Sequence, residues 1–298
     1  MLNKDLKVML CPELVEQVNL GAVLAVSVSG GKDSQAMLNV VMDWYRANNL
    51  TNEIFAIHAD LGRAEWAQTA EFTAQMCAAQ NIRLVTVRAE HEGKPIDLLD
   101  RMDLRQAQLK EQGRADVVFF PSYQQRYCTK DMKIDPCTHY YRQFDRIISI
   151  QGIRWAESKA RAQMPIFERR DGMKKKGGAL GFTWNPIIHF SFADVLAACG
   201  MSEEQYKHGR LQYQLTETIP SDWKLHPAYA IGNDRLSCSI CVLGSRNDVK
   251  NGIKHNPEFA EYLLQKERET GFAYQQGFSI HKALEQMQAG KNQGELFT

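Results

Sequence analysis

The sequence lacks an apolar run long enough to cross a bilayer, and its N-terminal residues combine acidic side chains with no sustained apolar core. It also lacks low-complexity stretches: 44% of its residues are hydrophobic and 24% are charged, as in ordinary globular proteins. Membrane spans, a secretory signal and extended disorder are therefore not expected. The sequence predicts a soluble, cytoplasmic protein that makes no membrane contact.

The chain also lacks an excess of charge of either sign, because 36 Lys and Arg residues balance 35 Asp and Glu residues. No global field would draw it onto nucleic acid, so any such contact has to be local. The candidate is residues 154–176, where eight basic residues face three acidic ones. A solvated loop is the alternative interpretation, and we prefer it for the KKKGG run at residues 174–178.

Seven cysteines are present, an odd number with uneven spacing, which does not suit a disulfide framework. They suit a reducing compartment, in which Cys binds a metal or cluster or packs in the core. Cys11, Cys77 and Cys199 lie in apolar, helix-like patterns and are expected to be core residues.

Short β-rich runs alternate with longer helical patterns over roughly the first half of the chain. We expect strands at residues 23–28, 53–59, 82–88 and 146–151, with helices at 34–47, 64–80 and around 96–112. Parallel strands need crossover connections, so this alternation predicts a doubly wound parallel sheet with helices on both faces, an α/β fold of Rossmann-like type.

The pattern changes after Gly177 and Gly178. We expect a last edge strand at residues 184–188, a helix capped by Ser191, a helix at 257–270 and a polar tail. The expected domains are a nucleotide-binding α/β domain at residues 1–190 and a smaller, mostly helical C-terminal region at residues 191–298, which carries a CxxC segment.

The first strand is followed by Ser29-Gly30-Gly31-Lys32-Asp33-Ser34 and then by a helix. Glycines let the backbone approach an anion, free amides at a helix N-terminus donate to phosphate oxygens, and Lys32 adds a cation. The run differs from the GxxxxGK[ST] loop, because Asp33 separates the lysine from the hydroxyl residue. A capped Gly-Gly turn is the alternative, but the strand-to-helix context favours a polyphosphate site.

This loop resembles the PP-loop of the adenine nucleotide alpha-hydrolase-like superfamily, which includes ATP pyrophosphatases, the small subunit of ATP sulfurylase and phosphoadenosine phosphosulfate (PAPS) reductase. Three further segments resemble PAPS reductases in particular, and together the likeness spans roughly residues 20–245. They are HADLG at residues 58–62, GIRWAESKAR at 152–161, and the HPAY-to-CxxC segment at 225–241. The resemblance implies the superfamily's α/β fold and an adenine nucleotide ligand.

The same resemblance selects further site residues. Asp60 ends the second strand and is expected to hold ribose or Mg²⁺, with a turn cap before Gly62 as the alternative. Gly152 belongs to the nucleotide site. Arg154 and Arg161 are expected to neutralise phosphate or sulfate.

Glu157 has two interpretations. It is expected to orient Arg154 or a metal, or to form only a helix-surface pair, since three residues separate the two side chains in sequence. We place Lys32, Asp33, Arg154 and Glu157 in the catalytic group.

The resemblance also implies a cysteine site. Cluster-bearing reductases of this family carry a Cys-Cys pair followed by KxxP, and a later CxxC; here Cys128 matches the first Cys, whereas Thr129 replaces the second. Cys238 and Cys241 form the CxxC, so three thiolates are candidate ligands of a [4Fe-4S] cluster. With three ligands one iron stays open and can carry sulfide.

Other interpretations of the cysteines stay open. Cys137 is an unmatched fourth candidate, and four ligands would close the site as a cluster or as structural Zn²⁺. Free thiols are the third alternative.

The family's simpler reductases attack their substrate with a Cys near the C-terminus, and this sequence has no Cys after Cys241. We therefore expect an enzyme that uses Mg²⁺ and ATP, forms AMP and adenylates its substrate for sulfur transfer, with a sulfur donor protein as partner and nucleic acid as one candidate acceptor. The alternatives are a PAPS or APS (adenosine phosphosulfate) reductase and a non-catalytic nucleotide-sensing module.

Overall fold

The computed structural model describes residues 6–170, 172 and 179–294, and the chain divides into two compact units. The sheet unit comprises Met1–Ala59, Gln68–Val87 and Asp135–Ala230, and the helical unit comprises Asp60–Ala67, Arg88–Ile134 and Ile231–Thr298. Residue 190, where the sequence predicts a domain boundary, lies within the last stretch of the sheet unit.

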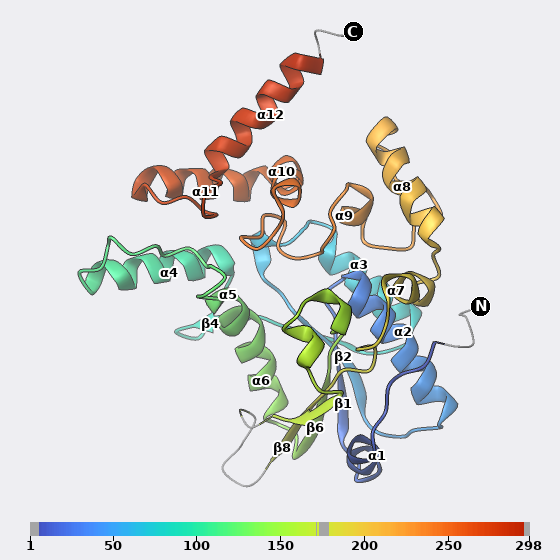
Figure 1. The fold of residues 1–298 in the computed structure, drawn as a ribbon. Coiled ribbons are helices and arrows are strands. Elements are labelled where there is room, and N and C mark those ends of the chain that lie inside the picture. The colour runs from blue at the N-terminus through green and yellow to red at the C-terminus, as the bar shows by residue number, and fades with distance from the viewer. Residues whose placement is uncertain (1–5, 171, 173–178, 295–298) are drawn as a thin grey trace. The chain divides into compact units, whose positions relative to one another are not determined.

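The sheet unit is built on a six-stranded sheet with the order β3-β2-β1-β6-β8-β7 (Figure 1). Its strands are β1 (Val23–Ser27), β2 (Ile54–Ala59), β3 (Leu84–Val87), β6 (Arg146–Ile150), β7 (Phe167–Arg169) and β8 (Leu180–Trp184). All neighbouring pairs are parallel except β7 and β8. The predicted α/β fold with a mostly parallel sheet is confirmed.

Helices cover this sheet because its central strands are apolar on both faces, as parallel strands with crossovers must be. Leu24, Ala25 and Val26 of β1 are fully buried. The helices and short helical turns of the sheet unit are α1 (Pro12–Asn19), α2 (Lys32–Ala47), α3 (Thr69–Ala79), α6 (Asp135–Tyr141), η3 (Trp155–Glu157), η4 (Arg161–Gln163), α7 (Phe192–Ala198), α8 (Glu203–Thr216) and α9 (Pro227–Ala230).

The predicted edge strand at residues 184–188 is wrong in place and in role. The strand is β8, which ends at Trp184 and lies inside the sheet between β6 and β7. Pro186 has no N–H to give to a sheet, so the strand stops before it. The edge strand on this side is β7, which has only three residues, two of them charged. Such strands are typical of sheet edges, but a segment this short gives almost no strand pattern in the sequence.

β1 lies between β2 and β6 in the sheet. The connection after β1 leads to β2 on one side of it, and the chain later forms β6 on the opposite side of β1. This is the topological switch point of an open α/β sheet, where ligands bind beyond the carboxyl ends of the strands. The loop at residues 29–34 follows β1, and the segment at 152–161 follows β6. The topology therefore places these two predicted motifs next to each other, beyond the carboxyl ends of the neighbouring strands β1 and β6.

The helical unit has a two-stranded hairpin and its own apolar core. Its elements are η1 (Gly62–Ala64), β4 (Ala89–His91), β5 (Lys94–Ile96), α4 (Leu98–Glu111), α5 (Tyr127–Thr129), η2 (Lys130–Ile134), α10 (Arg246–His255), α11 (Pro257–Thr270) and α12 (Ile280–Gly294). The helix expected at 257–270 is confirmed, whereas the expected polar tail contains α12.

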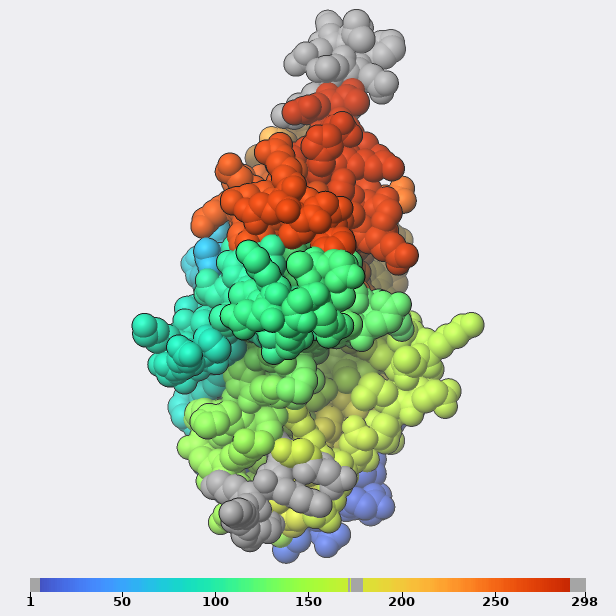
Figure 2. All heavy atoms as spheres, turned by 90° about the vertical axis from the view of Figure 1, so that its left-hand side faces the viewer, coloured from blue at the N-terminus to red at the C-terminus, as the bar shows by residue number. Residues whose placement is uncertain are grey.

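Contacts within this unit join segments far apart in sequence. Tyr262 on α11 donates to the carbonyl of Leu99 on α4 at 3.1 Å, and Lys266 donates to Gln106 at 2.9 Å. Figure 2 shows the green surface of α4 and the loop after it in direct contact with the orange and red surface of the C-terminal helices. In the described part of the chain, no helix has the length and apolar character needed to span a bilayer.

Candidate functional site

The loop after β1 is held in one conformation by its own serines. Gly30 has a φ of +73°, a left-handed conformation that glycine adopts without strain. Ser34 Oγ accepts from the Ser29 amide at 3.2 Å and donates to the Gly31 carbonyl at 2.8 Å. The loop is therefore shaped before any ligand arrives.

Helix α2 begins at this loop with a feature suited to anions. Gly31 is its N-cap and, as a glycine, supplies no side-chain cap hydrogen bond. The first turn of a helix carries amides without intrahelical partners and the positive end of the helix dipole. A phosphate group would satisfy both.

The segment after β6 touches this loop closely. A Cβ on Gly152 would lie 2.8 Å from the Asp33 carbonyl oxygen, so only glycine lets the two backbones come this near. Two residues later, Arg154 Nε donates to Asp33 Oδ1 at 2.5 Å, and its Nη1 donates to the Phe190 carbonyl at 3.4 Å. Two motifs predicted to share a site are thus in direct contact.

Asp33 is the centre of a small charge network. Its carboxylate also lies 3.0 Å from Lys32 Nζ, so one anion is shared between two cations, Lys32 and Arg154, which are 6% and 7% exposed. Buried charges are stable only when they are paired. The network carries one net positive charge beside the N-terminus of α2, and both features favour an anionic ligand.

Tyr229 is a site residue that the sequence reading missed. The Lys32 amide donates to its hydroxyl at 3.1 Å, and Lys32 Nζ lies 5.2 Å from the centre of its ring. The ring of Phe192 lies 5.9 Å from the same ammonium group. Tyr229 is the last residue of the HPAY motif at residues 226–229, so this motif is the sequence feature that could have pointed to it.

His226, in the same motif, acts as a structural residue. Burial lowers its pKa to about 4, so the ring is neutral near pH 7. Its Nδ1 accepts from the Ala228 amide at 3.1 Å, which leaves the proton on Nε2, 3.3 Å from Thr69 Oγ1. This hydrogen-bonding pattern fixes the turn that presents Tyr229.

Glu157 positions the arginine segment. It accepts from the backbone amide of Arg154 at 3.0 Å and forms an ion pair with Arg161. The contact to Arg154 is to its main-chain amide. Whether Glu157 orients the Arg154 side chain or a metal stays a prediction. Arg161 is partly exposed beside it, where a cation can reach an anion.

Asp60 lies in the helical unit and makes two contacts. Its Oδ1 accepts from the Gly62 amide at 2.7 Å, and its Oδ2 forms an ion pair with Arg88. The first contact is the turn cap that the sequence offered as an alternative. Binding of ribose or Mg²⁺ by Asp60 stays a prediction.

Three predicted thiols influence one another in the helical unit. Burial raises the pKa of the Cys238 thiol, and the nearby Cys241 and Cys128 raise it further, whereas Lys133 lowers it. Thiolates suit a cluster or Zn²⁺. Within the described residues, however, no three His, Cys, Asp or Glu side chains are placed to hold a metal ion, so the metal site stays a prediction.

The remaining cysteines belong to the sheet unit. Cys77 and Cys199 are buried as expected, whereas Cys11 is only half-buried, at the N-cap of α1. Cys137, the unmatched fourth candidate, packs against the apolar cluster formed by β1, β2, α6 and β6. Cys199 Sγ donates to the Lys32 carbonyl at 3.5 Å, and burial raises its pKa, which makes it a poor nucleophile.

The basic segment at residues 154–176 lies only partly in the described chain, and the KKKGG run falls outside it. Arg154 and Arg161 form ion pairs with Asp33 and Glu157. Arg170 donates to Thr138 Oγ1 at 3.0 Å. These three cations therefore have partners in the protein, and contact with nucleic acid stays a prediction.

Comparison with models of protein families identifies the family to which this chain belongs. A family model described as "Phosphoadenosine phosphosulfate reductase domain" matches residues 23–208. A protein of Escherichia phage 186, described as an uncharacterized 37.8 kDa protein in the gpa 5' region, is 25% identical over 277 residues, which cover 82% of this chain and 74% of that protein.

Two solved structures are similar at a greater distance. The PAPS reductase from Candida auris in its phosphate complex is 14% identical with a TM-score of 0.42, covering 78% of this chain and 97% of that one. The NAD⁺ synthetase from Burkholderia pseudomallei is 15% identical with a TM-score of 0.29, covering 47% of this chain and 60% of that one.

Proposed function

We propose that this chain, which belongs to the phosphoadenosine phosphosulfate reductase family, binds Mg²⁺-ATP at residues 29–34 and uses it to adenylate an acceptor for sulfur transfer. The observation that carries the proposal is Asp33, shared between the buried cations Lys32 and Arg154 at the N-terminus of α2, whose N-cap is a glycine. Such a site fits the pyrophosphate portion of ATP. The expected cytoplasmic location, where ATP is abundant, belongs to the same proposal.

In the proposed reaction an oxygen of the acceptor attacks the α-phosphorus of ATP. The bond from that phosphorus to the oxygen bridging to the β-phosphate breaks, and pyrophosphate leaves with the electron pair. Hydrosulfide, which a donor protein holds at the oxidation level of sulfide and releases as HS⁻, then attacks the acceptor atom that bears the adenylated oxygen. A bond from that atom to sulfur forms, its bond to the oxygen breaks, and AMP leaves with the electron pair. Neither step changes the net oxidation state, so no external reductant is needed.

The chain's residues contribute position and charge. The Lys32 ammonium group and the amides of Asp33 and Ser34 in the first turn of α2 hold the leaving pyrophosphate, and Arg154 neutralises charge that develops at the α-phosphate. Glu157 keeps the main chain of Arg154 in place, and Arg161 adds a second cation at the rim.

Mg²⁺ fits this site as a companion of the nucleotide. Protein sites commonly hold it through one or two carboxylates together with substrate phosphates, and Asp33 supplies such a carboxylate. A bound Mg²⁺ would neutralise phosphate charge. For Cys128, Cys238 and Cys241 we propose a cluster or zinc site, but no step of the reaction depends on it.

The first experiment is binding. Titration calorimetry with Mg²⁺-ATP compares the wild type with Lys32→Ala and with Lys207→Ala, a control whose side chain is 75% exposed on α8. We expect affinity to fall at least tenfold in Lys32→Ala alone. Equal affinity in all three proteins would refute the site.

The second experiment is turnover. Radiolabelled ATP is incubated with single-stranded DNA, RNA and hydrosulfide, and release of AMP and pyrophosphate above the acceptor-free level is expected for the wild type but not for Lys32→Ala. ATP binding without turnover would favour the sensing module.

A sulfonucleotide reductase is the second candidate, because the family model carries that description and the same anion site would hold the phosphates of PAPS. That reaction needs a thiolate or cluster to attack sulfur, and the buried Cys199 does not suit this role. Sulfite release from PAPS with thioredoxin, lost on Cys238→Ser, would make the reductase the better assignment.

A further inference from the structure

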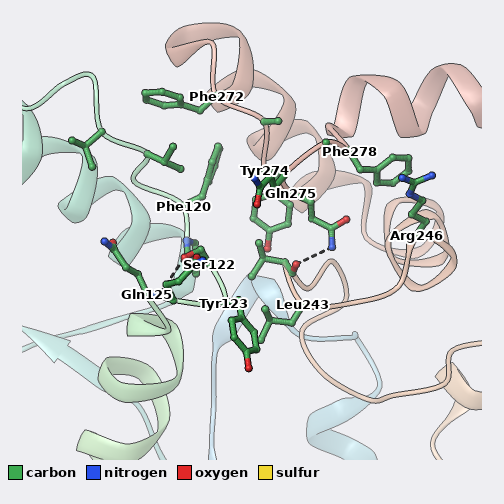
Figure 3. A pocket seen from close by; sticks show the side chains of 18 residues that line it. Phe120, Ser122, Tyr123, Gln125, Leu243, Arg246, Phe272, Tyr274, Gln275 and Phe278 are labelled. Carbon is green, nitrogen blue, oxygen red and sulfur yellow. Dashed lines mark hydrogen bonds between the residues drawn. The ribbon is translucent and has the colours of Figure 1, made fainter. Parts of the chain in front are cut away.

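A pocket of about 810 Å³ lies within the helical unit, and none of the site residues assigned above lines it (Figure 3). One wall is the loop at residues 117–125 between α4 and α5, and the other is the segment at 272–278 between α11 and α12. Val242, Leu243 and Arg246, which follow the CxxC segment, complete it. Its volume falls in the range of small-ligand sites, about 300–1,000 Å³.

Aromatic rings give the pocket flat, rigid walls. Phe120 and Tyr274 are 1% and 4% exposed and meet edge to face, with ring centres 5.3 Å apart at 89°. Phe278 is also buried, whereas Tyr123 is 76% exposed at the mouth. Walls of this kind suit a planar ligand that stacks on the rings. The exposed ring of Tyr123 can also stack on a base of a single-stranded nucleic acid.

The polar groups of the pocket are amides and one cation. The side chains of Gln124 and Gln276 line the pocket and are exposed, and neither has a hydrogen-bond partner among the described residues. Each presents one donor and one acceptor side by side, the pattern that reads the edge of a base. Arg246, over the Phe278 ring at 5.2 Å, is the only charged residue of the lining, so the pocket favours an anion.

The pocket wall is fastened to the cysteine segment. Tyr274 donates from its hydroxyl to the Ile240 carbonyl at 2.9 Å. The Gln275 amide donates to the carbonyls of Val242 at 2.8 Å and Gly244 at 3.0 Å. A ligand in the pocket would therefore have a fixed position relative to Cys238 and Cys241, which lie in the same loop.

We propose that this pocket binds a nucleobase together with its phosphate, and that this base belongs to the acceptor. The identity of the acceptor rests on the proposed function, whereas binding at the pocket does not. The ring faces stack on the base, the glutamine amides read its edge, and Arg246 pairs with the phosphate. The base comes from a free nucleotide or from a single strand, and these two sources share the chemistry.

The test is binding of fluorescein-labelled eight-nucleotide single strands of DNA and RNA, followed by anisotropy. Tyr123→Ala and Arg246→Gln, both at exposed positions that should not disturb folding, are compared with the controls Leu215→Ala and Lys282→Gln. We expect Tyr123→Ala to weaken binding about five- to hundredfold, the range for loss of a stacking ring. The controls should bind as the wild type does.

Competition identifies the source of the base. Displacement of the strand by AMP, CMP, GMP or UMP at comparable concentration assigns a free nucleotide, and displacement only by unlabelled strands assigns nucleic acid; either supports the proposal. No binding of strands or mononucleotides, or equal binding by all variants, overturns it and would leave the pocket to another partner such as a peptide.

Measuring both strand binding and Mg²⁺-ATP binding in Lys32→Ala and Tyr123→Ala distinguishes a failure of this inference from a failure of the proposed function. Lys32→Ala should bind strands as the wild type does, and Tyr123→Ala should bind Mg²⁺-ATP as the wild type does. Loss of strand binding in Lys32→Ala would contradict an independent pocket. If Mg²⁺-ATP fails to bind the wild type while strands bind at the pocket, the proposed function fails and the pocket stands.

Discussion

Arg154 donates a 2.5 Å hydrogen bond to the carboxylate of Asp33, a residue 121 positions earlier in the chain. Adjacent parallel strands β1 and β6 place the two residues at the same sheet edge. The bond links the segment that shapes the phosphate loop with the segment that follows β6. The consequences of this link can be measured.

Replacing Asp33 should change both stability and binding. Asp33→Ala leaves Lys32 and Arg154 without their shared partner, and removing one member of a buried ion pair costs about 3–5 kcal/mol. We expect a lower free energy of unfolding in urea without ligand. Phosphate or pyrophosphate should restore part of it, because an added anion can pair with the two cations. No recovery with pyrophosphate would contradict the assignment of the site.

Gly152 should tolerate no side chain. Gly152→Ala places a Cβ 2.8 Å from the Asp33 carbonyl, and the backbone there must shift. Overpacking of this kind costs about 1–3 kcal/mol, and we expect weaker binding of Mg²⁺-ATP by calorimetry. Gly172→Ala is the matched control, because a Cβ there meets nothing within 4 Å. Equal affinities in the two variants would argue against close contact of the segments.

His226 should make stability depend on pH. Its folded-state pKa of about 4 lies below the ordinary value of 6.5, so the unfolded chain binds the proton more tightly. Its contribution is complete above pH 6.5 and is lost as the pH falls from 6.5 toward 4, by about 3 kcal/mol in total. Urea unfolding between pH 4.5 and 7.5 should show this slope, and His226→Gln should flatten it. A slope equal to that of the wild type in His226→Gln would assign it to other groups.

The cysteine site is tested by metal content. We expect protein purified without oxygen to contain iron and sulfide, or zinc, and each of Cys128→Ser, Cys238→Ser and Cys241→Ser to lower that content. Cys11→Ser, at the half-buried N-cap of α1, is the control. Protein without bound metal, or unchanged content in all three variants, would leave these thiols as packing residues.

Local patterns predicted the elements around the site well. The strand at residues 23–28, the helix after it and the helix at 257–270 correspond to β1, α2 and α11. Gly31, Lys32 and Arg154 are predicted site residues because close backbone approach and charge for phosphate need particular residue types, and their roles in binding stay predictions. The contact between the two segments then followed from the order of parallel strands.

Long-range partners were not visible in the sequence. Tyr229 reaches the Lys32 amide from 197 positions away, and no local period encodes that contact. The β4–β5 hairpin was missed because its turn, at Glu92 and Gly93, relies on positive φ values of 51° and 75° in place of an Asn-Gly pair. The bond from the Arg154 main-chain amide to Glu157 was equally invisible, because the sequence pattern considers side-chain pairs.

The two units have a consequence for how the chain can be divided. The chain passes from one unit to the other five times, at residues 59–60, 67–68, 87–88, 134–135 and 230–231. No single cut in the gene can release either unit whole, and a fragment ending at residue 190 would lack α9 and with it Tyr229. A ribosome has synthesised most of the chain before the last segment of either unit emerges, so neither unit can complete its folding early during translation.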